Sequence, residues 1–210
     1  MSAQNRGSLV VIEGLDRSGK STQCQILMEK LQSKGKKVQL YKFPDRTTAI
    51  GKKIDAYLKE TSQLSDQVIH LLFSANRWEL IEDIQSKIQS GVTCILDRYA
   101  FSGIAFSAAK GLNWEWCKSP DRGLLRPDLV IFLHISPEVA AKRGQYGEER
   151  YENIEMQKKV EKNFERIERE YTEESLSFIT LDASTSLETV HSRIMNLVDQ
   201  VDVSKALETL

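Results

Sequence analysis

The sequence lacks the features that mark several large classes of protein. Its three cysteines (Cys24, Cys94 and Cys117) are far apart and form no CxxC pair, so neither disulfides nor a cysteine metal site are expected. No apolar run approaches the roughly 18 residues that a membrane span requires. The polar start, Met1–Ser8, contains no apolar segment of the kind found in secretory signals. These absences predict a cytoplasmic protein with reduced thiols, and they leave a nuclear or mitochondrial fraction open.

The chain also lacks an excess of charge of either sign. Its 29 basic and 30 acidic side chains leave a formal net charge of −1, whereas nucleic-acid-binding domains are normally basic. Balanced charge and 40% hydrophobic residues argue against disorder. A chain of this size buries about 70% of its unfolded surface, so it needs no structural metal. Because no repeat or linker divides residues 1–210, we expect one domain that binds neither nucleic acid nor membrane.

Short apolar runs alternate with helical patterns along the chain. The runs expected to form strands are Leu9–Glu13, Val38–Phe43, Val92–Leu96, Asp128–His134 and Ser177–Leu181. Helical spacing of apolar residues is found between them, at Ser21–Lys34, Ser65–Gln89 and Met156–Tyr171. Apolar strands separated by helices are typical of a parallel sheet covered on both faces. The predicted fold is therefore α/β: a three-layer α/β/α domain with a five-stranded parallel sheet.

Two of the expected helices differ in their apolar pattern. Met156–Tyr171 carries one apolar stripe, so the charges between are interpreted as a solvated face. In Val68–Ile84, by contrast, apolar residues cover more than one face of the helix. Two interpretations of this segment stay open: it lies deep in the core, or one of its faces meets a second subunit.

The strongest motif is Gly14–Ser21 (GLDRSGKS), which matches G-x-x-x-x-G-K-[ST] between an apolar strand and an amphipathic helix. Its glycines let the backbone wrap around phosphate, and the loop N–H groups and helix N-terminus supply positive potential. Lys20 offers a charge to the outer phosphates, while the Ser21 hydroxyl can bind or orient Mg²⁺ and its water. The chain is therefore predicted to bind a nucleoside triphosphate.

Charged residues follow two other expected strands. Asp97 lies directly after one of them, where a carboxylate suits outer-shell Mg²⁺ binding, and Arg98 comes next. Arg46 follows the strand that ends at Phe43. Ligands of open α/β sheets gather at the carboxyl ends of strands, so the paired arginines suit an acceptor phosphate held by forked hydrogen bonds. Such an acceptor is already anionic, and its phosphorylation needs no general base.

The motifs separate the chain from other P-loop classes. It has no N-K-x-D motif, which a GTPase would use to recognise its base, and remodelling ATPases and motors are usually larger. A kinase for a small phosphorylated acceptor fits best. A non-catalytic nucleotide-dependent switch remains an alternative of a different class, although the paired arginines argue against it.

Six segments, in order along nearly the full chain, carry a resemblance to a known family: Gly14–Thr22 (GLDRSGKST), Phe43–Arg46 (FPDR), Leu71–Trp78 (LLFSANRW), Asp97–Gly103 (DRYAFSG), Lys142–Asn153 (KRGQYGEERYEN) and Asp182–Ser184 (DAS). In them the sequence resembles the thymidylate kinases. This resemblance implies the P-loop nucleoside monophosphate kinase fold, ATP- and Mg²⁺-dependent phosphorylation of dTMP to dTDP, and a homodimer formed through the helix around residues 68–84. Kinases for CMP, UMP, AMP or a deoxynucleoside remain rival interpretations.

The resemblance assigns roles on the ATP side. The expected ATP-binding residues are Gly14, Arg17, Ser18, Gly19, Lys20, Ser21, Thr22, Arg143, Asp182 and Ala183. Of these, Arg143 would pack on adenine, with Asp182 and Ala183 bordering the same base. Mg²⁺ would be held by Ser21 and Asp97, directly or through water. The residues expected to act in catalysis are Arg17, Lys20, Asp97 and Arg98.

On the acceptor side, the resemblance implies that Asp16 contacts the 3′-hydroxyl of dTMP. Phe73 would stack on thymine and Arg77 would hydrogen-bond to its edge, and their spacing of four residues independently places both on one helix face. Arg46 and Arg98 would hold the acceptor phosphate. The remaining expected dTMP-binding residues are Phe43, Ser102, Gly103, Phe106, Ser107 and Tyr151, of which Tyr151 closes over the sugar.

Residues 141–153 resemble the mobile lid of the family. The segment combines positive charge with glycine, which gives the backbone freedom to move. One subclass of the family carries its transfer-assisting arginine in the P-loop, and the other carries it in the lid. Arg17 is typical of the first subclass, which argues against a catalytic role for Arg150.

Overall fold

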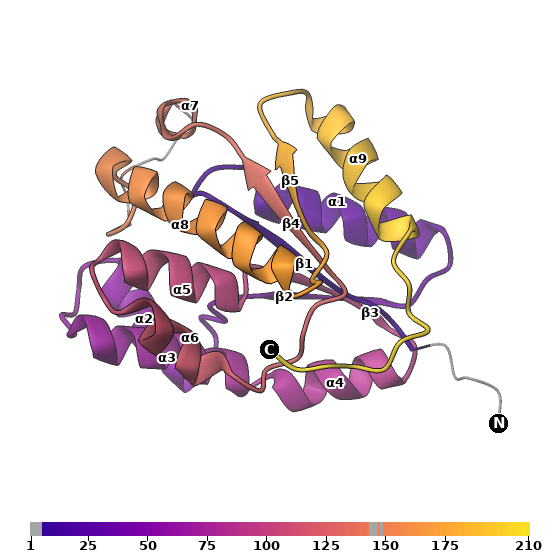
Figure 1. Ribbon diagram of the computed structural model, residues 1–210, viewed down its shortest axis with the longest axis horizontal. Coiled ribbons are helices and arrows are strands. Elements are labelled where there is room, and N and C mark those ends of the chain that lie inside the picture. The colour runs from indigo at the N-terminus through magenta and orange to yellow at the C-terminus, as the bar shows by residue number, and fades with distance from the viewer. Residues whose placement is uncertain (1–5, 143–146, 148) are drawn as a thin grey trace.

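A parallel sheet forms the centre of the molecule, as Figure 1 shows for this computed structural model, which describes residues 6–142, 147 and 149–210. Its five strands lie in the order β2-β3-β1-β4-β5, and every neighbouring pair is parallel. The strands are β1 (Leu9–Gly14), β2 (Val38–Lys42), β3 (Thr93–Asp97), β4 (Leu129–His134) and β5 (Phe178–Asp182). The predicted α/β fold and all five predicted strands are confirmed, with each bound shifted by at most one residue.

Helices cover both faces of the sheet. On one face lie α1 (Lys20–Ser33) and α9 (Leu187–Asp199), which pack on each other. On the other lie α4 (Ile81–Gln89), α5 (Ala100–Ala109) and α8 (Ile154–Glu173) (Figure 1). Because side chains alternate along a strand, Val10 and Ile12 of β1 join the first core, and Leu9 and Val11 join the second. Both cores are filled by apolar side chains that each contribute about 1.5–3 kcal/mol on burial.

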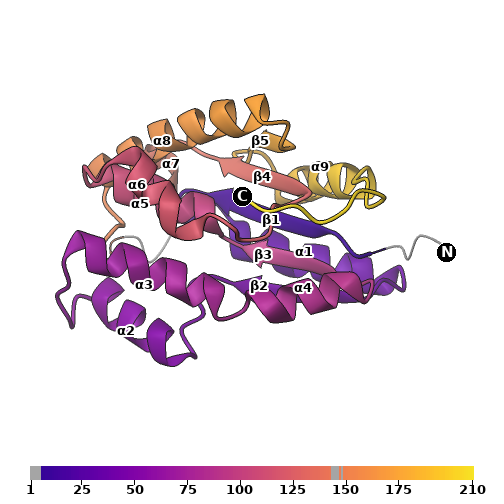
Figure 2. The same cartoon turned by 60° about the horizontal axis from the view of Figure 1, so that its bottom comes forward.

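A pair of helices lies outside the three layers. The helices α2 (Ala49–Leu58) and α3 (Asp66–Trp78) lie side by side at one end of the molecule (Figure 2) and enclose a smaller apolar cluster of their own. The remaining short elements are α6 (Trp114–Lys118), the 3₁₀ turn η1 (Ser119–Asp121) and α7 (Pro137–Ala141). We did not predict α2, although Thr48, whose hydroxyl accepts from the Gly51 N–H at 2.9 Å, is an N-cap that the sequence offers.

The single helix predicted over Ser65–Gln89 is wrong: the chain breaks between α3 and α4, and no proline or glycine announces the break. The reason for the break is tertiary packing. Helix α3 packs on α5 and η1, whereas α4 packs on β3, so one straight helix cannot make both contacts. The indole N–H of Trp78 donates to the carbonyl oxygen of Pro120 at 2.8 Å and fixes the end of α3. The predicted amphipathic helix at Met156–Tyr171 is confirmed as α8.

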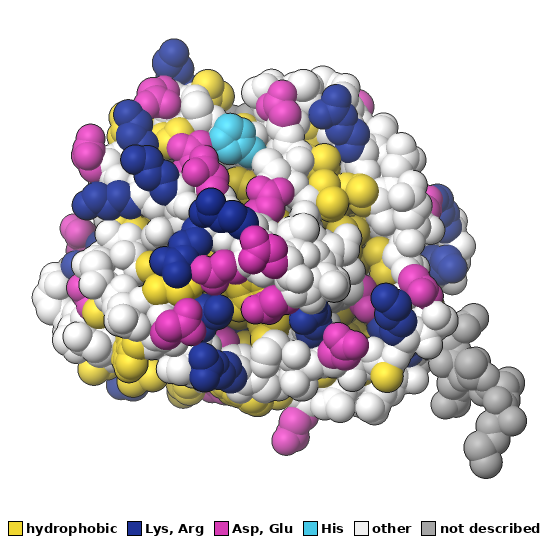
Figure 3. All heavy atoms as spheres, in the orientation of Figure 1, with side chains coloured by type: hydrophobic (Ala, Val, Ile, Leu, Met, Phe, Trp, Pro, Cys, Tyr) yellow, Lys and Arg dark blue, Asp and Glu magenta, His cyan; other side chains and the backbone are white. Residues whose placement is uncertain are grey.

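Acidic and basic side chains are interspersed over the face that Figure 3 shows, and no broad area of one sign is visible there. Among the described residues, no helix is both long and apolar enough to cross a membrane.

Candidate active site

The loop between β1 and α1 has the backbone that a phosphate-binding turn requires. Gly19 has a φ of 94° and Arg17 a φ of 63°, both in the left-handed region. At Gly14 a Cβ atom would lie 2.6 Å from Ser18 Oγ and 2.7 Å from the Leu133 carbonyl oxygen, so only glycine fits. Helix α1 begins at Lys20, directly after Gly19, and its free N–H groups face the loop. The predicted P-loop is therefore present with its geometry.

Lys20 is a buried cation within this loop. Its ammonium group donates to the Leu15 carbonyl oxygen at 2.5 Å and lies 3.4 Å from Ser18 Oγ. Burial, and secondarily the charge of Arg98, lowers the pKa of Lys20 to about 8. Phosphate oxygens beside this ammonium group would restore its preference for the charged form.

Ser21 and Asp97 form the predicted metal-binding pair. The Ser21 hydroxyl donates to Asp97 Oδ2 at 2.5 Å, and the Lys42 ammonium group lies 3.9 Å from the same oxygen. The described residues contain no cluster of three or more His, Cys, Asp or Glu side chains that could hold a metal by itself. Hydroxyl and carboxylate oxygens are nonetheless the donors that Mg²⁺ takes when phosphates and water supply the rest. The pair therefore fits an ion that arrives with a nucleotide.

Arg98 is held above the P-loop by several partners. Its Nη1 donates to the Gly14 carbonyl oxygen at 3.0 Å, and its Nη2 pairs with Asp16 Oδ1. Asp16 is in turn fixed by Gln157 of α8, whose Nε2 donates to Asp16 Oδ2 at 2.8 Å. The buried Gln157 side chain also donates to the Tyr151 carbonyl oxygen at 2.9 Å. Residues predicted from three separate motifs are thus brought into one network.

Glu13, which we did not predict, supports the network around Arg98 through its contacts with the start of α5. Its buried carboxylate accepts from the backbone N–H groups of Tyr99 and Ser102, at 2.9 and 3.1 Å, at the start of α5. The Ser102 hydroxyl donates to Glu13 at 2.6 Å, so it must accept the bond of 3.0 Å from Arg98 Nη1. Burial raises the pKa of Glu13. The available signal was an acid within an apolar run.

Arg46, the second predicted phosphate ligand, pairs with two carboxylates. Its Nη1 lies 2.7 Å from Asp55 of α2 and 2.7 Å from Glu149, which belongs to the predicted lid. The loop that carries Arg46 is anchored by Asn76 of α3, whose amide bonds to the backbone N–H and carbonyl oxygen of Asp45 at 2.7 and 3.2 Å. A buried amide on one helix thus fixes the loop after β2.

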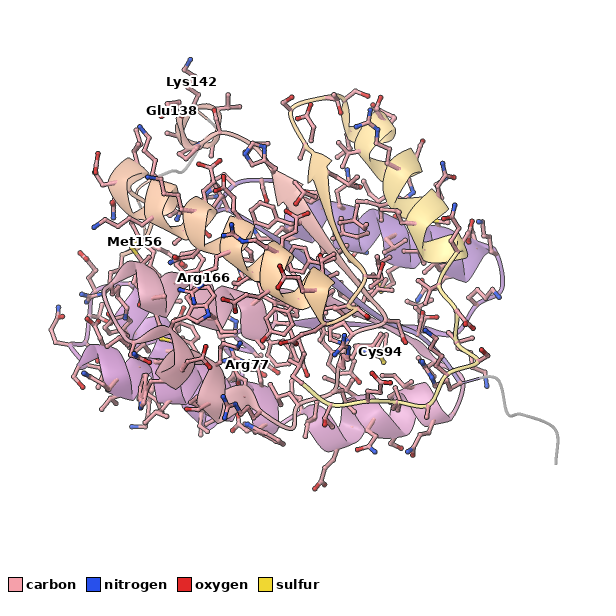
Figure 4. The ribbon with its side chains drawn as sticks, in the orientation of Figure 1. Arg77, Cys94, Glu138, Lys142, Met156 and Arg166 are labelled. Atoms are coloured by element: carbon pink, nitrogen blue, oxygen red, sulfur yellow. The ribbon has the colours of Figure 1, made fainter. Side chains whose placement is uncertain are left out.

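A cavity of about 540 Å³ joins the P-loop to a pocket between α3 and α5. Phe73 and Arg77 of α3 line it, as their spacing predicted. Arg77 is labelled in Figure 4, where α3, α5 and α6 lie together. Across the pocket, Phe106 and Tyr151 pack with ring centroids 5.5 Å apart. This volume and mixture of aromatic and charged walls suit a small anionic ligand.

Most of the predicted residues meet at this cavity. Those that line it are Asp16, Arg17, Gly19, Lys20, Ser21, Thr22, Phe43, Arg46, Phe73, Arg77, Asp97, Arg98, Ser102, Gly103, Phe106, Ser107 and Tyr151. Lining residues that we did not predict are Lys42, Pro44, Leu58, Tyr99, Glu149 and Glu152.

The remaining predicted residues lie elsewhere. Gly14 and Ser18 shape the P-loop without lining the cavity. Asp182 ends β5 and Ala183 follows it, and the Ala183 N–H donates to the His134 carbonyl oxygen at 2.8 Å. Arg143 lies outside the described residues, so its predicted contact with adenine stays a prediction.

Comparison with known proteins agrees with the nucleotide-binding geometry of the site. The family profile described as thymidylate kinase matches residues 12–194. The chain belongs to the thymidylate kinase family. It is similar to the thymidylate kinase of Schizosaccharomyces pombe, with 72% identity over 210 residues and full coverage of both chains. The human thymidylate kinase is 48% identical over 193 residues, covering 91% of this chain and 90% of the human one.

A solved structure supports the fold. Thymidylate kinase from Candida albicans superposes with a TM-score of 0.87 at 39% identity, and the match covers 98% of each chain. Together with the family profile and the relatives, this structure confirms the predicted fold, the assignment as a phosphotransferase and the predicted phosphorylation of dTMP to dTDP.

Proposed function

We propose that dTMP binds with its phosphate between Arg46 and Arg98 and its base between Phe73 and Arg77. The observation that carries this proposal is the single cavity, which connects these four side chains to the P-loop. Each arginine offers a planar fork of N–H donors that matches phosphate oxygens. The ATP phosphates would lie in the loop around Lys20, and the acceptor oxygen and γ-phosphate would then face each other.

The chemistry proposed for this arrangement is direct in-line transfer. The dTMP phosphate oxygen is already anionic, so the protein contributes position and positive charge instead of a covalent intermediate. Lys20, Arg17 and Arg98 would spread positive charge over the oxygens of the transferring group. Mg²⁺ would be held by Ser21 and, through water, by Asp97. The ion would place further positive charge beside the phosphate oxygens.

Three carboxylates of the site pair with the arginines that are proposed to bind phosphate. Arg17 Nε lies 3.0 Å from Glu152, Arg46 lies 2.7 Å from Glu149, and Arg98 pairs with Asp16. We infer that the phosphate of dTMP replaces Glu149 at Arg46. Since Glu149 and Glu152 lie within the predicted lid, residues 141–153, this exchange would couple ligand arrival to the position of these two side chains.

The chain is proposed to belong to the subclass with an arginine in the P-loop. Two observations support this assignment. Arg17 lines the cavity within the P-loop. Arg150 is instead held against α2, where Nε donates to the Tyr57 carbonyl oxygen at 3.0 Å and the guanidinium carbon lies 4.1 Å above the Tyr57 ring. Transfer would therefore rely on Arg17.

A homodimer through α3 is also proposed. Val68, Leu71 and Trp78 of this helix are 44%, 46% and 40% exposed. Apolar side chains gathered on one helix face are typical of a surface that a partner covers. Of the two interpretations of this segment, the exposure of these three side chains favours the one in which a face meets a second subunit. A cytoplasmic location is supported by the three cysteines, which are free and buried.

A panel of acceptors tests the proposed function. Purified protein would be given ATP and Mg²⁺ with dTMP, dUMP, dCMP, CMP, UMP, AMP or thymidine, and ADP release would be followed. The highest kcat/KM is expected for dTMP. Preference for another monophosphate, or for thymidine, would contradict the proposed pocket. Absence of any acceptor-dependent turnover would favour the non-catalytic alternative.

A further inference from the structure

A buried ion pair lies behind the proposed base pocket. The Arg77 guanidinium donates from Nε to Asp121 Oδ1 at 3.1 Å and from Nη2 to Asp121 Oδ2 at 2.6 Å. The side chains of Arg77 and Asp121 are only 3% and 2% exposed. Two parallel bonds to one carboxylate fix the plane of the guanidinium as well as its position.

Asp121 is itself fixed by the helix that carries Arg77. It ends the 3₁₀ turn η1, and Ser74, one turn before Arg77 on α3, donates to Asp121 Oδ1 at 2.7 Å. The Ser74 hydroxyl also lies 3.0 Å from the carbonyl oxygen of Pro120, which accepts from the Trp78 indole at 2.8 Å. Side chains from three positions of α3 therefore hold η1 in one place.

The free edge of the guanidinium is directed by this clamp. With Nε and Nη2 engaged by Asp121, Nη1 makes no hydrogen bond to any other part of the chain that the structure describes, while Arg77 lines the cavity. On the α5 side, a Cβ atom at Gly103 would lie 2.8 Å from Arg77 Nη2. The absence of a side chain there lets the guanidinium lie flat against α5, with its donors toward the ligand.

We propose that Asp121, oriented by Ser74, is a positioning residue that sets base specificity by fixing the donors of Arg77. The proposal rests on the proposed function, in which Arg77 faces the edge of the base. Fixed N–H donors suit the carbonyl oxygen that thymine carries at C4. Cytosine has an amino group at that position, and two sets of donors would then face each other. A deoxycytidine monophosphate would be rejected for this reason.

A purely stabilising role does not account well for the pair. Buried ion pairs can often be replaced by apolar residues without loss of stability, because desolvation of the two charges offsets their attraction. Here the cation of the pair, Arg77, also lines the ligand cavity and so has a second use. Asp121 keeps Arg77 oriented where an apolar wall would suffice for packing.

Four variants test the inference: Asp121→Asn, Ser74→Ala, Arg77→Met, and the double variant Arg77→Met/Asp121→Asn, which is compared with Arg77→Met. For Asp121→Asn we expect the KM for dTMP to rise about tenfold and the preference for dTMP over dCMP to fall about tenfold, the size of one lost base contact. The KM for ATP should stay the same. Ser74→Ala should raise the KM for dTMP and lower the preference for dTMP over dCMP, each by about threefold. Glu115→Gln removes a carboxylate from α6, near η1, without touching Arg77, and serves as the matched control.

In the Arg77→Met background, Asp121→Asn should have no further effect on the KM for dTMP, because its action passes through Arg77. The inference is overturned if Asp121→Asn and Ser74→Ala lower only the melting temperature and leave KM and selectivity at wild-type values. Should Asp121→Asn fail to fold, Ser74→Ala and the double variant decide in the same way. If Arg77→Met itself leaves the KM for dTMP unchanged, the proposed base pocket fails, and this result is distinct from failure of the Asp121 clamp.

Discussion

Several side chains that build this site are charged or polar and nevertheless buried. Lys20, Glu13 and Arg77 are each less than 7% exposed, and each is surrounded by hydrogen-bond partners. Burial of a charge destabilises a fold unless partners replace the lost water. Active sites commonly accept such destabilisation because the same charges perform the chemistry. Removal of one of them should therefore separate stability from activity.

Lys20→Met is expected to lower turnover by about 100-fold or more, since the substitution removes a donor to the transferring phosphates. At pH 7 it should leave the protein folded and raise its free energy of unfolding by about 1–3 kcal/mol. The reason is that burial lowers the pKa of Lys20 to about 8 from its ordinary value of 10.5. Holding this lysine charged below pH 8 therefore costs the folded protein free energy.

The difference in free energy of unfolding between Lys20→Met and the wild type should depend on pH. Between about pH 8 and 10.5 the unfolded chain binds the Lys20 proton and the folded protein does not, so the wild type gains stability as the pH rises. The advantage of Lys20→Met should shrink over the same interval in chemical denaturation experiments. Wild-type turnover in the variant, or a stability difference independent of pH, would refute the assigned role of Lys20.

At the scale of elements, α3 shows where sequence reasoning works and where it fails. The spacing of Phe73 and Arg77 correctly placed both on one face toward the cavity. Yet the buried side of α3 holds the polar residues Ser74, Asn76 and Arg77 as well as Ile69. The apolar side chains of Val68, Leu71 and Trp78 face outward. A periodicity argument assumes that the apolar side is the buried one. That assumption fails here because Asn76 holds the loop after β2, Ser74 holds η1, and Arg77 forms part of the cavity wall.

Other elements of the site also divide into those that the sequence predicts and those that it does not. The P-loop and the strand ends were predictable, since glycine spacing and strand-terminal charges follow local rules. The break after Trp78 and the partnership of Glu13 with the start of α5 depend on contacts between segments distant in sequence. The break leaves no local pattern in the sequence, and the acid within an apolar run at Glu13 does not show which segment it contacts.

The exposed side of α3 makes a prediction about assembly. Leu71→Glu should convert a dimer to monomers, because a carboxylate would be buried without a partner in the interface. Sedimentation velocity over a range of concentrations measures this change. Leu187→Glu, at an equally exposed leucine on α9, is the matched control and should leave the assembly unchanged. A wild type that is monomeric at all concentrations, or a Leu71→Glu dimer, would refute the proposed interface.

At the scale of the whole molecule, the fold gathers distant residues at one edge of the sheet. Strands β1, β2 and β3 end next to one another, so the P-loop, the loop of Arg46 and the pair Asp97–Arg98 meet there. Helix α8 adds Gln157 from the opposite end of the chain, and α2 and α3 close the side of the cavity. The fold thus brings Asp16 and Gln157, which lie 141 residues apart in the sequence, into one site.

The central claim is that two fixed guanidinium groups hold the acceptor phosphate opposite the P-loop. It is tested most directly by a crystal structure with dTMP, Mg²⁺ and a non-hydrolysable ATP analogue. The account predicts the dTMP phosphate within hydrogen-bond distance of both Arg46 and Arg98, with Glu149 displaced from Arg46. A dTMP phosphate bound away from either arginine, or an Arg46–Glu149 pair still intact beside bound dTMP, would contradict it.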